Sequence, residues 1–137
     1  MKQSLVFFCA ILFFNAVTAQ LNIGVLKNAH FKEHKDCFVV GYIEYKAPKK
    51  GIVLMEYSTS CSSNPTAECF YALVEINKKE LELAAINCPD ASNGYTSKDK
   101  KTMITITEEK NSKYTIKITR GNSTVILKNC TMISHSG

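Results

Sequence analysis

The chain has 137 residues, 45% hydrophobic and 21% charged, with a net charge of +5. A chain of this length supports one domain around a single hydrophobic core. Its lysines are scattered over expected turns and are not gathered on one face with stacking aromatic residues. This pattern argues against a nucleic-acid-binding protein.

The first 19 residues predict a secretory signal peptide. Lys2 precedes the apolar run 5–14, and the small-residue end Val17-Thr18-Ala19 resembles a cleavage site. The run is too short to span a membrane, and we see no later stretch that could anchor the chain. Removal of residues 1–19 leaves 118 residues, 20–137, and lowers the net charge to +4. We therefore expect one secreted, extracellular β-domain without a transmembrane anchor, in which cysteines form disulfides.

Apolar and polar residues alternate along most of the mature chain, and no helical period persists. Such period-two alternation is typical of strands with one buried face. In chain order, residues 21–25 form a short first strand, and the polar segment 28–36 is a helical turn or a loop. Strands 38–45 and 52–59 follow, joined by a turn at 47–51.

The middle of the chain contains one expected hairpin between two polar segments. Residues 58–68 are rich in Ser and Thr and are expected to form an exposed loop. Strands 69–77 and 80–88 then pair around a turn at Lys78-Lys79. Residues 89–101 are expected to be irregular, and loops of that length are often engaged in binding.

Three further strands are expected at 102–107, 113–119 and 123–132, and Gly121-Asn122 is a tight-turn signal between the last two. The count is seven or eight strands in a small domain. The sequence therefore predicts an all-β fold, either a small antiparallel β-sandwich or a barrel, stabilised by disulfides.

Six cysteines occur, and five remain once Cys9 is removed with the signal segment. If Ile76 pairs with Leu81 across the hairpin turn, the count along both strands places Cys69 directly opposite Cys88. Cα atoms of such a non-hydrogen-bonded pair lie about 4.5 Å apart, which permits a disulfide. We therefore predict a Cys69–Cys88 bridge.

The pairing of the other cysteines stays open. Cys61 could instead bond to Cys69 across the polar loop, and Cys130 could bond to Cys37 or to Cys61. The odd number leaves one thiol, which is either buried and inert or available for a covalent dimer.

One short motif has the spacing of a metal site. Residues 30–34 read His-Phe-Lys-Glu-His and match the H-x-x-E-H string of a zinc peptidase family. The segment is short, it borders a strand, and no third ligand follows at a suitable distance, so we expect no metal site. A nucleophile elbow, paired carboxylates and a Gly-rich phosphate loop are also not visible. We expect neither an enzyme nor a bound cofactor.

Two sequons for N-glycosylation are present. The first begins at Asn122, at the tip of an expected hairpin, where a glycan would not disturb the core. The second begins at Asn129, which strand alternation places on the same face as Val125 and Leu127. We therefore expect a glycan at Asn122 and an unmodified Asn129.

The run of antiparallel strands after a signal peptide is similar to secreted lipocalin-type carriers. The Gly-x-Trp signature of that family is absent, because Gly41 is followed by Tyr42-Ile43 and the chain has no tryptophan. The resemblance implies a barrel that carries a small hydrophobic ligand. A continuous apolar pocket of about 300 to 1,000 Å³ would support such a carrier. An interior filled by the following side chains would exclude it: Phe70, Val74, Leu83, Ile104 and Ile116.

The favoured hypothesis is an extracellular binding protein that acts through its loops. A signal peptide, a small cross-linked scaffold, two long polar loops and no catalytic constellation motivate it. Its expected partner is an extracellular protein or a cell-surface molecule, such as a receptor, a protease, or a defence or host factor. The alternative is the lipocalin-like carrier.

Overall fold

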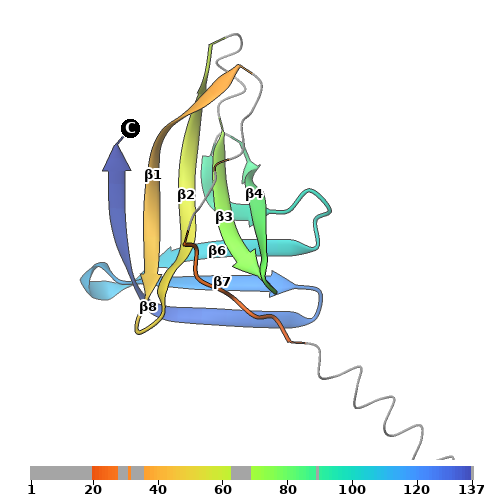
Figure 1. The fold of residues 1–137 in the computed structure, drawn as a ribbon, viewed down its shortest axis with the longest axis vertical. Helices are drawn as coiled ribbons and strands as arrows, with labels where there is room; N and C mark the ends of the chain where they lie inside the picture. Colours follow the sequence, from red (N-terminus) through yellow and green to blue (C-terminus); the bar gives the residue numbers. More distant parts are fainter. Residues whose placement is uncertain (1–19, 28–30, 32–35, 63–68, 89, 137) are drawn as a thin grey trace, which may run out of the picture.

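The fold, seen in a computed structural model that describes residues 20–27, 31, 36–62, 69–88 and 90–136, is all-β. Eight antiparallel strands follow one another around a closed barrel, so the barrel is the correct one of the two expected architectures (Figure 1). The described residues contain no helix with the length and apolarity needed to cross a bilayer. The strands are β1 (Cys37–Ala47), β2 (Gly51–Cys61), β3 (Phe70–Ile76), β4 (Lys79–Asn87), β5 (Asp90–Thr96), β6 (Thr102–Glu108), β7 (Tyr114–Arg120) and β8 (Ser123–Ser136).

The long strand β8 closes the barrel by changing partners along its length. Its first half pairs with β7, from Arg120↔Ser123 onward, and its second half pairs with β1. Between the two halves the register shifts, and Asn129 takes a positive φ of 59°. In Figure 1 the strand runs along β7, turns, and rises beside β1 to the C-terminus. The bulge therefore directs one strand into two parts of the sheet.

The N-terminal segment closes one end of the barrel, at the β1–β2 and β3–β4 turns. Ile23 forms an isolated bridge with Ile76, and the Asn77 amide donates a hydrogen bond of 2.8 Å to the Asn22 carbonyl. The side chains of Leu21 and Ile23 are buried in the barrel core. The expected strand at 21–25 is therefore wrong as a regular strand, although its apolar residues fill the end of the barrel.

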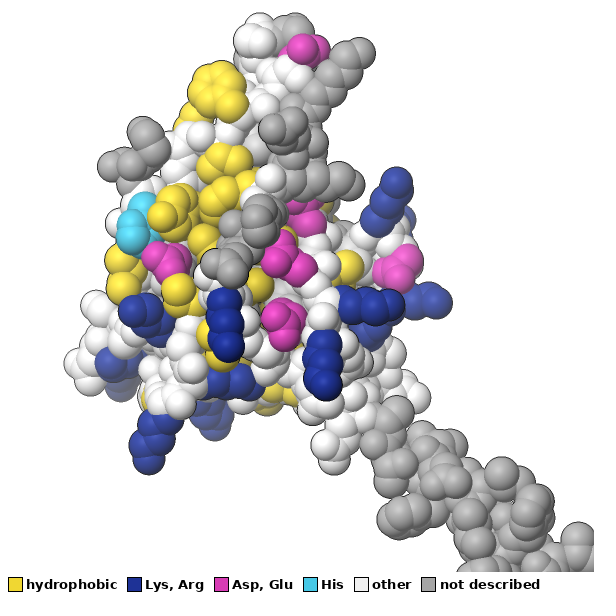
Figure 2. All heavy atoms as spheres, viewed as in Figure 1, with side chains coloured by type: hydrophobic (Ala, Val, Ile, Leu, Met, Phe, Trp, Pro, Cys, Tyr) yellow, Lys and Arg dark blue, Asp and Glu magenta, His cyan; other side chains and the backbone are white. Residues whose placement is uncertain are grey.

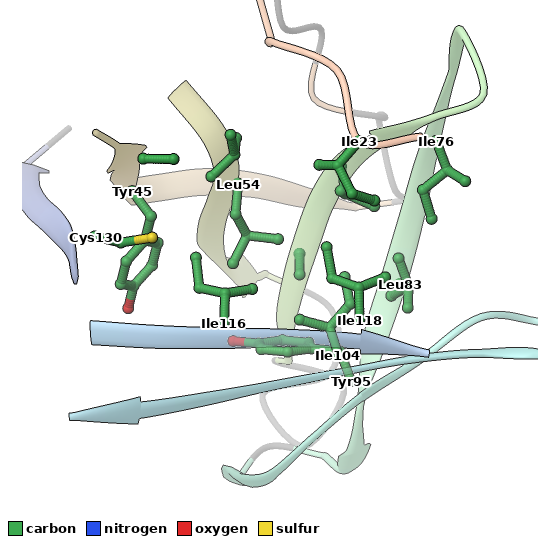
Figure 3. Close-up of a cluster of buried hydrophobic side chains, with 14 of the residues drawn as sticks. Ile23, Tyr45, Leu54, Ile76, Leu83, Tyr95, Ile104, Ile116, Ile118 and Cys130 are labelled. Carbon is green, nitrogen blue, oxygen red and sulfur yellow. The ribbon is translucent and has the colours of Figure 1, made fainter. Parts of the chain in front are cut away.

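The core fills the part of the barrel nearest this closed end. In Figure 3, Ile23 and Ile76 lie together on one side of the cluster, and Tyr45 and Cys130 lie on the other. Burial of each large aliphatic side chain contributes roughly 1.5 to 3 kcal/mol. Seven of these side chains have no solvent exposure: Val53, Leu54, Val74, Leu83, Ile104, Ile116 and Ile118.

A second apolar layer lies on the outer surface of β1, β2 and β3. Leu26 packs there against Met55 and Leu73. Phe31 reaches the same face, with its ring centroid 5.4 Å from that of Tyr42 and 4.7 Å from that of Tyr57. The N-terminal segment thus contributes to both sides of the sheet, inside the barrel and outside it.

Strand β5 lies within the segment that was expected to be irregular. Asn87↔Asp90 and Ala85↔Tyr95 join it to β4, and Tyr95↔Ile104 joins it to β6. Gly94 has a φ of 89° there, and a Cβ atom at this position would lie 2.5 Å from the Ile104 carbonyl oxygen. The prediction of a loop over 89–101 was therefore wrong for 90–96, because backbone pairing forms without strand-like side chains.

The β3–β4 hairpin differs by two residues from the expected register. Its turn is Asn77-Lys78, with φ values of 51° and 68°, and Leu81 pairs with Val74 instead of Ile76. A shift of two preserves which face each side chain occupies. The predicted Cys69–Cys88 disulfide is therefore confirmed despite the wrong register. The two cysteines lie beyond the last paired residues, and their Cα atoms are 5.1 Å apart.

A second disulfide joins Cys37 to Cys61, which are direct register partners at the far ends of β1 and β2. This pairing excludes both open alternatives for Cys61, the bridge to Cys69 and the bridge to Cys130. Of the five cysteines in the part of the chain that the structure describes, Cys130 is the free thiol, and it has no solvent exposure. Burial raises the pKa of its thiol. These properties match the buried option for the odd cysteine.

Candidate ligand site at the barrel mouth

The end of the barrel opposite the N-terminal segment contains a hollow of about 600 Å³. Its wall includes the side chains of Tyr45 from β1, Glu56 from β2 and Tyr95 from β5. Glu108 and Tyr114, which pair with each other at the ends of β6 and β7, complete the opposite side. Five strands therefore meet at this opening, which we call the mouth.

A second hollow of about 350 Å³ lies beside the first one. It is lined by Ile43, Phe70 and His135, among others, and it shares Glu56 and Ala91 with the larger hollow. The two hollows therefore flank the same carboxylate. Glu56 stands between them and can be reached from both.

Glu56 is held by two tyrosines from other strands. The Tyr45 hydroxyl donates a hydrogen bond to Oε1 of Glu56, and the Tyr95 hydroxyl donates one to Oε2. Burial raises the pKa of both tyrosines above the usual 10.0, and the interaction with Glu56 raises it further. Both hydroxyls therefore stay protonated at neutral pH and remain donors.

The strand pattern explains why a carboxylate lies inside the barrel. Along β2 the side chains of Leu54 and Glu56 share the inner face, while Met55 belongs to the outer layer. Glu56 is partly buried, whereas Leu54 has no exposure. The inner face of β2 thus changes from apolar to acidic where the filled core ends and the mouth begins.

Aromatic rings and apolar side chains form the rest of the wall. The rings of Tyr45 and Tyr114 meet edge to face, with centroids 5.5 Å apart and planes at 76°. Ile106 and Ala91 add apolar surface, and both are partly buried. The mouth therefore combines an apolar wall with one acceptor group, as many small-molecule sites do.

The charge of the mouth is opposite to that of the chain. Neither hollow has a lysine or arginine among its described lining residues, although the chain carries +5 overall. Lys110 and Lys113 follow Glu108 along the chain but do not line either hollow. On the face shown in Figure 2, lysines and arginines lie mainly over the middle and lower part, and apolar side chains gather at the upper left.

The rim of the mouth exposes apolar side chains. Phe38 of β1 is 60% exposed and Phe70 of β3 is 41% exposed. Phe70 lines the smaller hollow, as does Val40, two residues after Phe38 along β1. Single exposed apolar residues are common on protein surfaces, but a group of them beside an opening marks a contact surface.

Two further hollows lie along β4, beside the β5–β6 turn. Their walls contain Glu80, Lys98 and Lys79, all exposed to solvent. Exposed charges of both signs are typical of a solvated groove. The mouth is therefore the stronger candidate, because its acceptor group is partly buried and is held in place from two other strands.

Sequence reasoning located some of these residues and missed the central one. Of the side chains whose presence in the interior would exclude a carrier, Val74, Leu83, Ile104 and Ile116 are fully buried, but Phe70 lies at the rim. Residues 30, 33 and 34 of the H-x-x-E-H string lie outside the described residues. The role of Glu56 was missed, and its only signal was an acidic residue at an inward position of an apolar strand.

The two sequon asparagines, Asn122 and Asn129, both lie at the surface. Asn122 is exposed at the β7–β8 turn, as expected. Asn129 is also exposed, so its expected place on the face of Val125 and Leu127 was wrong. The bulge at Asn129 interrupts the alternation and turns its side chain outward.

Comparisons of the chain with protein-family models, with curated proteins and with solved structures found no match.

Proposed function

We propose that this protein is an extracellular binding protein that holds a small amphipathic ligand in the mouth of its barrel. One observation carries the proposal: the Glu56 carboxylate, held by Tyr45 and Tyr95, faces hollows of about 600 and 350 Å³ at the open end of an otherwise apolar barrel. The two disulfides support an extracellular location, because such bonds persist in oxidising compartments.

The filled core limits the size of the ligand. Leu83, Ile104 and Ile116 occupy the deeper half of the barrel with no solvent exposure. A long acyl chain that extends through the barrel would have to displace them, at a cost of several kcal/mol. The proposal is therefore a shallow carrier for a compact ligand and differs from the deep apolar pocket that the lipocalin resemblance implies.

Indole compounds provide a direct test. Because the chain has no tryptophan, the indole fluorescence of a probe is not overlapped by tryptophan emission from the protein. We expect at least one of tryptamine, tryptophol and indole-3-acetate to bind saturably. Ala91, which lines both hollows, can be enlarged to block them. Ala91→Phe should weaken binding at least tenfold, whereas the matched change Ala84→Phe, in the groove along β4, should leave it unchanged. Equal effects of the two changes, or no saturable binding of any probe, would contradict the proposal.

A second candidate function is docking of an extracellular protein on the apolar rim. The exposure of Phe38 and Phe70, 60% and 41%, favours it. Phe38 lines neither hollow, so Phe38→Ser should weaken capture of such a partner and leave probe binding intact, while Ala91→Phe should do the reverse. Capture that survives the rim change would exclude this candidate.

A further inference from the structure

We infer that the ligand carries a cationic amine, which the Glu56 carboxylate receives between Tyr45 and Tyr95. The inference rests on the proposed function, because it names the ligand class of the same mouth. It follows from three features of the site: the acceptors that remain on the carboxylate, the charge of the surrounding wall, and the aromatic rings beside it.

The carboxylate has unused acceptor capacity. Each carboxylate oxygen can accept about two hydrogen bonds, and each oxygen of Glu56 receives one from a tyrosine hydroxyl. Neither the Arg120–Asp99 ion pair nor the contact between His135 and Glu44 involves Glu56. The site therefore offers acceptors to a ligand that brings donors, and an ammonium group brings three.

The wall favours a positive charge over a negative one. Glu108 lines the same hollow as Glu56, and no described lysine or arginine does. A ligand carboxylate would have to approach Glu56 without a compensating cation, which costs free energy in a partly buried site. A neutral hydroxyl could donate to Glu56, but without the stronger charge-assisted bond that an ammonium forms.

The aromatic wall adds a second contact for a cation and a surface for the ligand's apolar part. Tyr45, Tyr95 and Tyr114 all line the larger hollow. A cation within about 6 Å of an aromatic ring centre is attracted by the negative face of the ring. Ile106 supplies apolar surface next to them. The chemical class that fits is a compact arylalkylamine.

The three indole probes test this inference, since they share a ring and have similar side-chain lengths but end in an amine, an alcohol or a carboxylate. We expect tryptamine to bind about tenfold or more tightly than tryptophol, and indole-3-acetate to bind most weakly. Glu56→Gln keeps the size and one acceptor oxygen, and should bring the tryptamine-to-tryptophol ratio close to one. Glu82→Gln is the matched control, because Glu82 also accepts a hydrogen bond from a tyrosine, Tyr57, but lies away from the mouth. It should leave the ratio unchanged.

The possible outcomes separate the two proposals. If the probes bind in the mouth, as Ala91→Phe reports, but the alcohol or the acid binds as tightly as the amine, the inference is wrong and the proposed function stands. If no probe binds saturably, both are wrong. If Glu56→Gln does not fold, the ratio measured on the unaltered protein still decides, because a ratio near one overturns the inference without any variant.

Discussion

Tyr42 of β1 and His135 of β8 stack across the seam that closes the barrel, with ring centroids 4.5 Å apart and planes at 18°. The two residues are direct register partners. Nε2 of His135 also contacts a carboxylate oxygen of Glu44, two residues after Tyr42 along β1. Because β8 ends at Ser136, these side chains hold the last paired residues of β1 and β8 together beside the mouth.

The stacked pair should stabilise this seam. We expect Tyr42→Leu and His135→Leu to show a coupling free energy of about 0.5 to 1.5 kcal/mol in a double-mutant cycle. Chemical denaturation of the four proteins measures it. Amide exchange at 131–136 should also accelerate in both single variants. Additive effects, with no coupling, would show that the stack contributes nothing.

The two disulfides should each stabilise the fold by constraining the unfolded chain. The bonded cysteines are 24 residues apart in Cys37–Cys61 and 19 apart in Cys69–Cys88. Replacing either pair by alanine should lower the free energy of unfolding by about 3 kcal/mol. Cys130→Ala is the control without a bridge. In the native protein Cys130 should resist alkylation until denaturant is added, and rapid alkylation would contradict its burial.

The β3–β4 turn contains a residue in an unfavourable conformation. Lys78 has a φ of 68° in a two-residue turn, where glycine is the preferred residue. Lys78→Gly should therefore stabilise the protein by roughly 0.5 to 1 kcal/mol. Lys79→Gly, one residue later in β4, should destabilise it by a similar amount, because glycine weakens a strand. Thermal unfolding of both variants measures the two effects. If both variants were more stable than the unaltered protein, or both less stable, the prediction would be wrong.

Three buried tyrosines should make the fold sensitive to alkali. Burial raises the pKa of Tyr45, Tyr57 and Tyr95 above the usual 10.0, and hydrogen bonds to glutamates add to the effect. Since the folded state retains these protons, its stability is fully present below about pH 10 and falls as the pH rises further. Each such tyrosine contributes a slope of about 1.4 kcal/mol per pH unit. Tyr57→Phe should reduce the slope, and an unchanged slope would contradict the assignment.

The sequence predicted those parts of the fold that alternation encodes. Strands β2, β6 and β7 show period-two patterns with β-branched residues, and their expected positions agree with the structure to within a few residues. Strand β5 was missed because its sequence, DASNGYT, has the composition of a loop. Only its backbone pairing with β4 and β6 makes it a strand, and backbone pairing leaves no trace in composition.

The site was not predictable to the same extent, for a physical reason. Glu56 meets Tyr45 across neighbouring strands but meets Tyr95 only because the barrel closes and brings β5 opposite β2. Alternation states which face a residue occupies, but not which residue faces it across the interior. The same limit explains why Phe70 was expected in the interior. Alternation correctly predicts that it faces inward, but not that this inward position lies at the rim.

The bulge in β8 leads to a prediction about modification. Asn122 and Asn129 both begin sequons and both are exposed, the first at a turn and the second where the strand bends. We therefore expect two glycans when the protein is secreted from eukaryotic cells. Thr131→Val should remove one of them, seen by mass spectrometry before and after enzymatic deglycosylation, whereas Thr131→Ser preserves the sequon and should keep both. This pair leaves Asn129 itself in place, so its φ of 59°, which asparagine tolerates well, is not disturbed. A single glycan on the unaltered protein, at Asn122, would show that exposure in the bulge is not sufficient.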